Sequence, residues 1–198
     1  MIFIEFLVDA MNKEQIGNNF FIPMPVVLVG TQVSGNANFM TVGWVARANA
    51  NPPMIVCGIG NHHYTPKGIE ENGTFSVNIP STDLIVKTDY CGIVSGSKTD
   101  KSKVFDIFYG NLKTAPLIKE CPVSIECKLV QIIPLPTNSL YLGEIVGVWV
   151  DGEIMADGKP DINSIDPIFL SMPDNRYWNL GEHIGYAWSD GKDLQLNE

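Results

Sequence analysis

The chain beyond residue 25 alternates short apolar runs with turn residues, which is the pattern of consecutive β-strands. The run VVLVGTQ at 26–32 is rich in valine and is followed by VSGN, a sequence typical of a tight turn. The next run, ANFMTVGWVARA at 37–48, completes a predicted antiparallel hairpin. A third strand is predicted in NPPMIVCGIG at 51–60, because its two prolines exclude a helix.

Two short helices are predicted between the strands. Thr65 as the N-terminal cap, Pro66 at the first helical position and Gly73 just past the end predict a helix over 65–73. The segment 81–96 begins with serine and threonine and then spaces its apolar residues helically. We therefore expect a second helix within it.

Strand patterns dominate the rest of the chain. The further predicted strands are 74–80, 121–135, 139–154 and 166–172, whereas 100–108 is predicted to be irregular or a short helical turn. Gly143 and Gly147 indicate a bulge or a bend in one of the long strands. Many strands and few short helices favour a closed or split antiparallel β-barrel over a doubly wound α/β fold.

Composition and charge narrow the class of protein. The 198 residues are 45% hydrophobic and 18% charged, which indicates a globular domain, and no linker divides them. A net charge of −9 argues against nucleic-acid binding, and no apolar run approaches the ~20 residues of a membrane span. The first ten residues contain acidic side chains and no basic leader, so a cytoplasmic location is expected.

Cysteine and histidine spacing gives no indication of a metal site. The four cysteines form no CxxC pair, and the three histidines show no HxxxH spacing. Free thiols and the absence of a metal centre are therefore expected. Cys91 is predicted to be a packed, inert thiol.

The segment HHYTPKGIEENGTF, at 62–75, contains the first candidate binding residues. Thr65 either caps its own helix, which is the simpler interpretation, or completes a phosphate site at the helix N-terminus. His62 and His63 are adjacent and would point to opposite sides of an extended segment, so they are poorly placed to bind one metal. One of the two imidazoles fits better beside the same anion as Thr65.

Two further stretches leave alternatives open. In NANFMTVGW, Trp44 near a strand end is typical of core packing, although it could pack against a flat ring whose edge Asn38 would bind. The loop TDYCGIVSGSKTDK, at 88–101, is either a solvated loop or an anion-contacting loop. Its lysines do not have the spacing of a P-loop.

Several stretches in this order closely resemble flavoredoxin and its relatives in the flavin reductase-like family. They are PVVLVGT, NFMTVGWVARANANPP, TFSVNIPSTD, DYCGIVSGSKTDK, LYLGEIV and RYWNLGEHIG. The resemblance implies an FMN-binding split β-barrel with Greek-key antiparallel topology, and a homodimer with one FMN per subunit near the interface. It also implies a family domain over 17–198, with residues 1–16 as an N-terminal extension.

The resemblance carries cofactor contacts to particular positions of this chain. Asn38, Thr41 and Trp44 match flavin contacts, and Tyr177 or Trp178 matches an aromatic residue that approaches the cofactor. The positions matched to the phosphate side or its loop are His63, Tyr64, Thr65 and Lys101. Asn138 stands where relatives usually carry a histidine, and an amide cannot carry charge or relay a proton as an imidazole does.

The implied activity is electron transfer through FMN, with no side chain acting as a catalytic acid or base and no metal ligand. The electron donor is either NAD(P)H or a redox protein. Three alternatives stay open: a non-catalytic FMN electron carrier, a reductase that releases flavin to a partner monooxygenase, and a split-barrel module that binds haem, a deazaflavin or pyridoxal phosphate.

Overall fold

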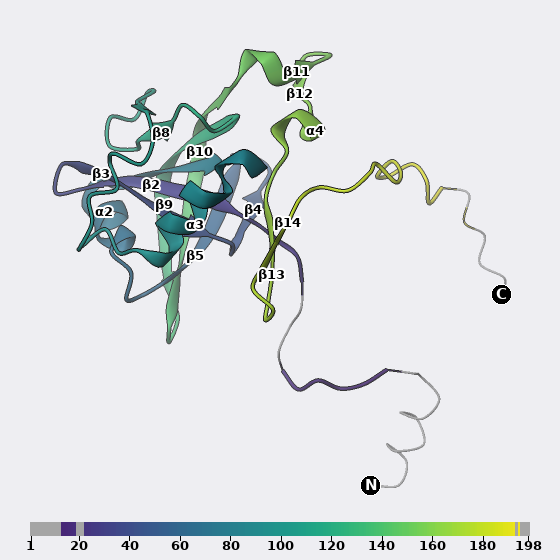
Figure 1. Ribbon diagram of the computed structural model, residues 1–198, viewed down its shortest axis with the longest axis horizontal. Coiled ribbons are helices and arrows are strands. Elements are labelled where there is room, and N and C mark those ends of the chain that lie inside the picture. The colour runs from purple at the N-terminus through teal and green to yellow at the C-terminus, as the bar shows by residue number, and fades with distance from the viewer. Residues whose placement is uncertain (1–12, 19–21, 193, 195–198) are drawn as a thin grey trace, which may run out of the picture.

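The computed structural model describes residues 13–18, 22–192 and 194 (Figure 1). Its main element is an antiparallel sheet with the strand order β3-β2-β6-β9-β10-β5-β4. The strands are β2 Val27–Val33, β3 Asn36–Val42, β4 Val45–Asn49, β5 Met54–Gly60, β6 Thr74–Ile79, β9 Val123–Pro134 and β10 Asn138–Val150. Because β3 and β4 are its two edges and follow each other in the chain, the sheet curls into a barrel that stays open between them.

Smaller elements surround this sheet. The three-stranded sheet consists of β1 Met24–Pro25, β13 Phe169–Ser171 and β14 Arg176–Trp178. Two short ribbons consist of β7 Ile107–Phe108 with β8 Leu117–Ile118, and β11 Met155–Ala156 with β12 Lys159–Pro160. The helices are α2 Thr65–Asn72, α3 Ile85–Ile93 and α4 Ile162–Ile165, with 3-10 turns at Thr82–Leu84 and Gly152–Ile154. No described helix is long and apolar enough to cross a membrane.

The hairpin predicted at the start of the domain is confirmed as β2 and β3. Ser34 and Gly35 form its turn with φ of 51° and 81°, a left-handed conformation that glycine adopts without strain. The predicted strand 37–48 is in fact two strands, because the chain bends at Gly43–Trp44 and continues as β4. The bend leaves Trp44 45% exposed, so core packing was the wrong expectation for its side chain.

Most other predicted elements are confirmed with small shifts. The helix at 65–73 is α2, which ends at Gly73 with φ of 63°, and α3 lies within 81–96. The bulge expected in the long strand 139–154 appears as register shifts near Gly143 and Gly147 in β10. The stretch 100–108 is irregular until β7 begins. Most of the expected 1–16 extension lies outside the described residues.

Two apolar clusters hold the fold together. One fills the barrel, and Ile69 of α2 belongs to it with Val29 and Phe75. The other joins the outer face of β2 and β3 to α3 through Leu28, Phe39 and Cys91. The residues of β2 are therefore almost all buried on both faces, which explains why its sequence is mainly apolar apart from Thr31 and Gln32.

Candidate functional site

Lys101 is buried in the loop that follows α3, with only 4% of its surface exposed. Its Nζ donates to the carbonyl oxygens of Phe39 in β3, at 3.0 Å, and of Cys91 in α3, at 2.8 Å. It forms no ion pair with any described carboxylate. The neighbouring Asp100 faces Ser102 and Lys103 instead. The ammonium group is thus covered but not neutralised.

A buried ammonium without a counter-charge is costly, because burial removes its hydration. Burial lowers the pKa of Lys101 below its ordinary value of 10.5 for the same reason. An anion bound at Nζ would reverse both effects, since it would neutralise the charge and favour the protonated amine. The surroundings of Lys101 therefore fit an anion-binding site.

Asn38 and Thr65 form a buried polar pair beside this lysine. Asn38 Nδ2 donates to Thr65 Oγ1 at 2.9 Å, and no described residue accepts the hydroxyl hydrogen of Thr65. The other amide atom, Asn38 Oδ1, is buried without a partner. A Cβ atom at Gly96 would collide with it, so the backbone must approach closely here. The pair thus leaves one donor and one acceptor for a ligand.

The N-terminus of α2 lies at the same place, and its cap differs from the prediction. Tyr64 is the N-cap residue and makes no side-chain capping bond, whereas Thr65 is the first helical residue. Thr65 therefore lies one position past the capping residue, and its hydroxyl oxygen accepts from Asn38. The first turn contains no acidic residue, and its partly positive amide groups suit an anion.

The two histidines before α2 share one side of a turn. Their ring centroids are 4.1 Å apart, so the expectation of opposite directions was wrong. The segment is a turn rather than an extended strand, and both rings lie over Gly60, the last residue of β5. Burial, then the charges of His62 and Lys101, lower the pKa of His63. His63 therefore belongs to the same electrostatic environment as Lys101.

These residues line two hollows that share part of their lining. A small cavity is lined by Met40, His63, Tyr64, Thr65, Cys91, Gly92, Val94, Ser95, Gly96 and Lys101. A wider hollow of about 400 Å³ lies beside it and shares Tyr64, Gly96 and Lys101. We call Asn38, His63, Tyr64, Thr65 and Lys101 the polar corner.

Cys91 lines the polar corner with a buried thiol. It is 1% exposed, and burial raises its pKa to about 11. The predicted packing of this cysteine is confirmed, and its thiol stays protonated at neutral pH.

Aromatic residues from other elements lie near the other end of β3. Between Asn38 and Val42 the strand spans about 13 Å at the usual rise per residue. Thr41 lies between the ends, where its hydroxyl donates to the carbonyl of Thr88 in α3. Beyond it, Trp44 lines a largely apolar groove of about 470 Å³ that also includes Gly58 and Leu140.

Tyr177 lies near this end on the small sheet. It pairs with Leu170, whose side chain packs at Gly43 beside Trp44. Its hydroxyl donates to Asp89 of α3 at 2.8 Å, and burial followed by this contact raises the pKa of Tyr177 to about 12. We call Trp44 and Tyr177 the aromatic end.

Asn138 begins β10 and pairs with Gly60, next to the two histidines rather than in the hollow itself. The structure thus brings five of the nine predicted residues into the polar corner. Trp44 and Tyr177 lie at the aromatic end, and Thr41 lies between the two ends. Asn138 lies beside the histidines and outside the hollow.

Sequence reasoning did not single out several residues of the hollow. Gly96 and Ser95 were part of a loop described only as glycine- and serine-rich, and Gly92 packs against Thr41. A small residue at each of these positions is the available signal, because α3 at Gly92 and the following loop at Gly96 approach the side chains of Thr41 and Asn38 in β3.

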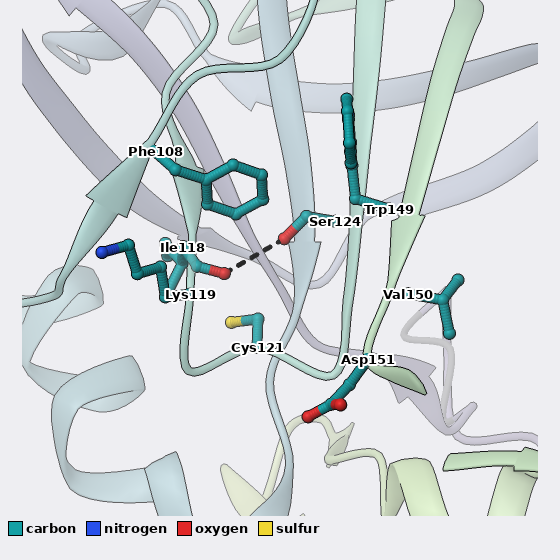
Figure 2. A pocket seen from close by; sticks show the side chains of 8 residues that line it. All are labelled: Phe108, Ile118, Lys119, Cys121, Ser124, Trp149, Val150 and Asp151. Atoms are coloured by element: carbon teal, nitrogen blue, oxygen red, sulfur yellow. Dashed lines mark hydrogen bonds between the residues drawn. The ribbon is translucent and has the colours of Figure 1, made fainter. Parts of the chain in front are cut away.

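Another hollow of about 400 Å³ lies apart from these residues (Figure 2). Phe108 and Trp149 form one wall with ring centroids 6.0 Å apart, and Ser124 donates to the carbonyl of Ile118 at 3.3 Å. Lys119 and Asp151 lie at its border. No lining side chain has an unpartnered buried polar atom, in contrast to the polar corner. Among the residues that the structure describes, no cluster of three metal-ligating side chains occurs.

The sequence and the fold have clear counterparts among known proteins. The family model described as flavin reductase like domain matches residues 19–163. An uncharacterized protein of Archaeoglobus fulgidus is 32% identical over 167 residues, which cover 83% of this chain and 93% of that protein.

Two solved structures are also similar. Flavoredoxin from Methanosarcina acetivorans is 52% identical with a TM-score of 0.91, and the match covers 93% of this chain and 100% of that one. Flavoredoxin of Desulfovibrio vulgaris (Miyazaki F) is 34% identical with a TM-score of 0.85, and the match covers 91% of this chain and 100% of that one. The predicted mainly β, split-barrel fold is confirmed.

Proposed function

Because the chain belongs to the flavin reductase-like family, we propose that it binds FMN along β3 and transfers electrons between a donor and an acceptor. The observation that carries this proposal is the buried, unneutralised Lys101 beside the N-terminus of α2. A cofactor with a phosphate at one end and an aromatic ring system at the other fits a site that is cationic at one end of β3 and aromatic at the other.

The residues of the polar corner would hold the phosphate end. Lys101 Nζ has two carbonyl partners, which leaves its third hydrogen for a phosphate oxygen. The free hydroxyl hydrogen of Thr65 and the first amides of α2 would supply neutral donors to the same group. Asn38 Oδ1 would accept from a hydroxyl of the ribityl chain, which would satisfy its unpartnered lone pairs.

The rest of the predicted set would orient the ring end. Trp44 is partly exposed at the aromatic end, and the hydrogen bond from the Tyr177 hydroxyl to Asp89 holds Tyr177 in place. His63 would lie beside the phosphate, with an imidazole that is neutral or charged depending on pH. Asn138 lies beside the histidines, so it would contact the cofactor only from their side. FMN, when bound, supplies one- and two-electron chemistry that no side chain provides.

The proposed donor is NAD(P)H or a redox protein, and a homodimer in the cytoplasm is part of the same proposal. The four cysteines are free thiols, as is usual in a reducing compartment. Stopped-flow mixing of holoprotein with NADH and NADPH tests the donor. Rapid bleaching of the flavin bands supports a reductase, whereas a spectrum that does not change leaves only the carrier role with a protein donor.

Titration of apoprotein with FMN and with riboflavin tests the phosphate site directly. Riboflavin lacks only the phosphate, so we expect FMN to bind about 100-fold more tightly. The double variant Thr65→Ala and Lys101→Ala should lose this preference, whereas Lys103→Met, which removes a nearby exposed lysine, should keep it. Equal affinity of the wild-type protein for both flavins would refute the phosphate assignment. A Soret band or a pyridoxal spectrum in fresh protein would refute FMN itself.

A further inference from the structure

The C-terminal arm, residues 179–192, leaves the barrel after β14 and runs away from it (Figure 1). Ile184 and Trp188 are 99% and 96% exposed, and Tyr186 is largely exposed as well. The arm nevertheless has local structure, because the amide of Tyr186 donates to Asp190 and its ring packs on His183. Within the described part of the chain, the hydrogen bonds of residues 183–194 join that segment only to itself.

Three large apolar side chains within five positions make an unusual free surface. Burial of such side chains is favourable by about 25 cal/mol for each Å² removed from water. Contiguous apolar exposure of this kind typically marks a contact site. The arm points away from the barrel, and no described residue of the barrel covers its apolar side chains.

The groove at Trp44 has the complementary character. Its lining is Ile22, Pro23, Met24, Pro25, Gly43, Trp44, Val45, Ala46, Val56, Gly58 and Leu140. This lining is apolar, and the volume of about 470 Å³ admits large side chains. Among the described residues, no side chain from elsewhere in the chain fills this groove, and none covers the apolar residues of the arm.

The edge strand β4 runs along this groove, and no described segment pairs with its free edge. Ala46, Arg47 and Ala48 are all exposed, and a bare strand edge with small side chains allows another chain to approach closely. The Nε of Arg47 donates only to the carbonyl of Asn49, and no described carboxylate pairs with it. The arm carries Glu182, Asp190 and Lys192, and Asp190 already accepts from the amide of Tyr186. Glu182 has no described ion-pair partner, so its carboxylate can pair with Arg47 of another copy.

We propose that the arm of one copy lies in the Trp44 groove of a second copy, and that the exchange is reciprocal. In a two-fold dimer the same contact forms twice, since each copy supplies one arm and one groove. This inference rests on the proposed function, because it specifies how the proposed homodimer forms. It also makes the partner's arm the cover of the ring end of the cofactor site.

A second exposed apolar surface competes for the arm. Val86 and Ile93 of α3 are 78% and 73% exposed, and Tyr90 lies between them. This stripe is the convex side of a helix and lines no described hollow, so it offers less enclosure than the groove. Docking of the arm on α3 is therefore the alternative outcome that the experiment must detect.

Engineered disulfides test the contact in the full-length protein. The native cysteines are all buried, so new thiols will react selectively. We expect Ala46→Cys with Ile184→Cys to give a disulfide-linked dimer on a non-reducing gel. The matched pair Val86→Cys with Ile184→Cys, and each single variant, should stay monomeric on that gel. An internal disulfide, equal linkage at position 86, linkage by position 184 alone, or no linkage would each overturn the proposal.

Sedimentation of Ile184→Ser with Trp188→Ser gives an independent measurement. We expect the dimer dissociation constant to rise at least about tenfold, because two arm contacts are lost from each dimer. An unchanged constant, or a wild-type protein that is monomeric, would overturn the arm contact. The preference for FMN over riboflavin in the same variant reports on the polar corner. A wild-type protein that shows no preference for FMN over riboflavin would instead refute the proposed function.

Discussion

Glu126 and Lys101 are both buried charged residues, but their surroundings differ. Glu126 is fully covered and accepts from the amide of Leu112 at 2.7 Å, from Trp149 Nε1 at 2.9 Å and from Asn111 Nδ2 at 3.3 Å. Lys101 is nearly as buried, yet it has two carbonyl partners and no described anion. The fold supplies Glu126 with its own donors, whereas the charge of Lys101 remains available to a ligand.

This difference separates a charge that the fold itself satisfies from a charge that we propose binds a ligand. The donors to Glu126 come from the loop 110–112 and from β10, so the carboxylate ties that loop to the barrel. Lys101 instead joins β3 to α3 through backbone carbonyls that any sequence would offer. Substitution of Glu126 should therefore affect stability alone, and substitution of Lys101 should affect ligand affinity alone.

The largest effect is expected for Glu126→Gln. The amide group brings hydrogen-bond donors toward three existing donors, so we expect a loss of about 3 kcal/mol in the free energy of unfolding. Urea denaturation measures this loss, and the exposed Glu153→Gln serves as the control. The affinity for FMN should not change. A loss below about 1 kcal/mol would show that the carboxylate is not a structural anchor.

Lys101→Met should show the opposite behaviour. We expect FMN to bind about 30-fold more weakly, or about 2 kcal/mol, because one charge-assisted hydrogen bond is lost. The unfolding free energy of the apoprotein should change by less than about 1 kcal/mol, since relief of the buried charge offsets the loss of two hydrogen bonds. Flavin fluorescence titration and urea denaturation measure the two quantities. If stability falls and affinity does not, the contrast with Glu126 is wrong.

The affinity for FMN should fall with rising pH in the alkaline range. Burial lowers the pKa of Lys101 in the free protein, and a bound phosphate raises it. Affinity is therefore full below the free-state pKa and falls, by up to about tenfold per pH unit, as the free protein loses this proton. Titrations between pH 7 and pH 10 measure the slope. Lys101→Met should lack it, and an identical slope in that variant would assign the effect to another group.

The smallest effect is expected for Thr65→Val. Valine keeps the shape of threonine but removes the hydroxyl donor and the acceptor of Asn38, so we expect affinity for FMN to fall up to about tenfold. The control is Thr31→Val, a buried threonine whose hydroxyl donates to the carbonyl of Thr74 away from the corner. Thr31→Val should reduce stability and preserve affinity. Equal affinities in the two variants would remove Thr65 from the phosphate site.

Local sequence patterns predicted most of the fold but only part of the site. The hairpin β2–β3 and the end of α2 at Gly73 depend on neighbouring residues, so they were predictable. The bend at Gly43–Trp44 was not, because the sequence on both sides continues to alternate as a strand does. The directions of His62 and His63 depend on a turn whose sequence has no strong signature.

The state of Lys101 could not be predicted from its local sequence. Its carbonyl partner Phe39 lies 62 positions away, and neighbouring lysines in the same loop are exposed. The family resemblance marked Lys101 as a cofactor contact, but only the packing of α3 on β3 shows that it is buried. The orphaned oxygen of Asn38 likewise depends on the approach of Gly96 from a distant loop.

The four buried cysteines affect the chemical durability of the protein. Reduced flavins generate hydrogen peroxide when they meet dioxygen, and thiolates are the groups that peroxide attacks first. Cys57 is fully covered and burial raises its pKa to about 12, while burial also raises the pKa values of Cys91, Cys121 and Cys127. Every thiol is thus kept protonated and enclosed. If the protein binds a reduced flavin as proposed, these thiols are protected from the peroxide that the flavin would generate.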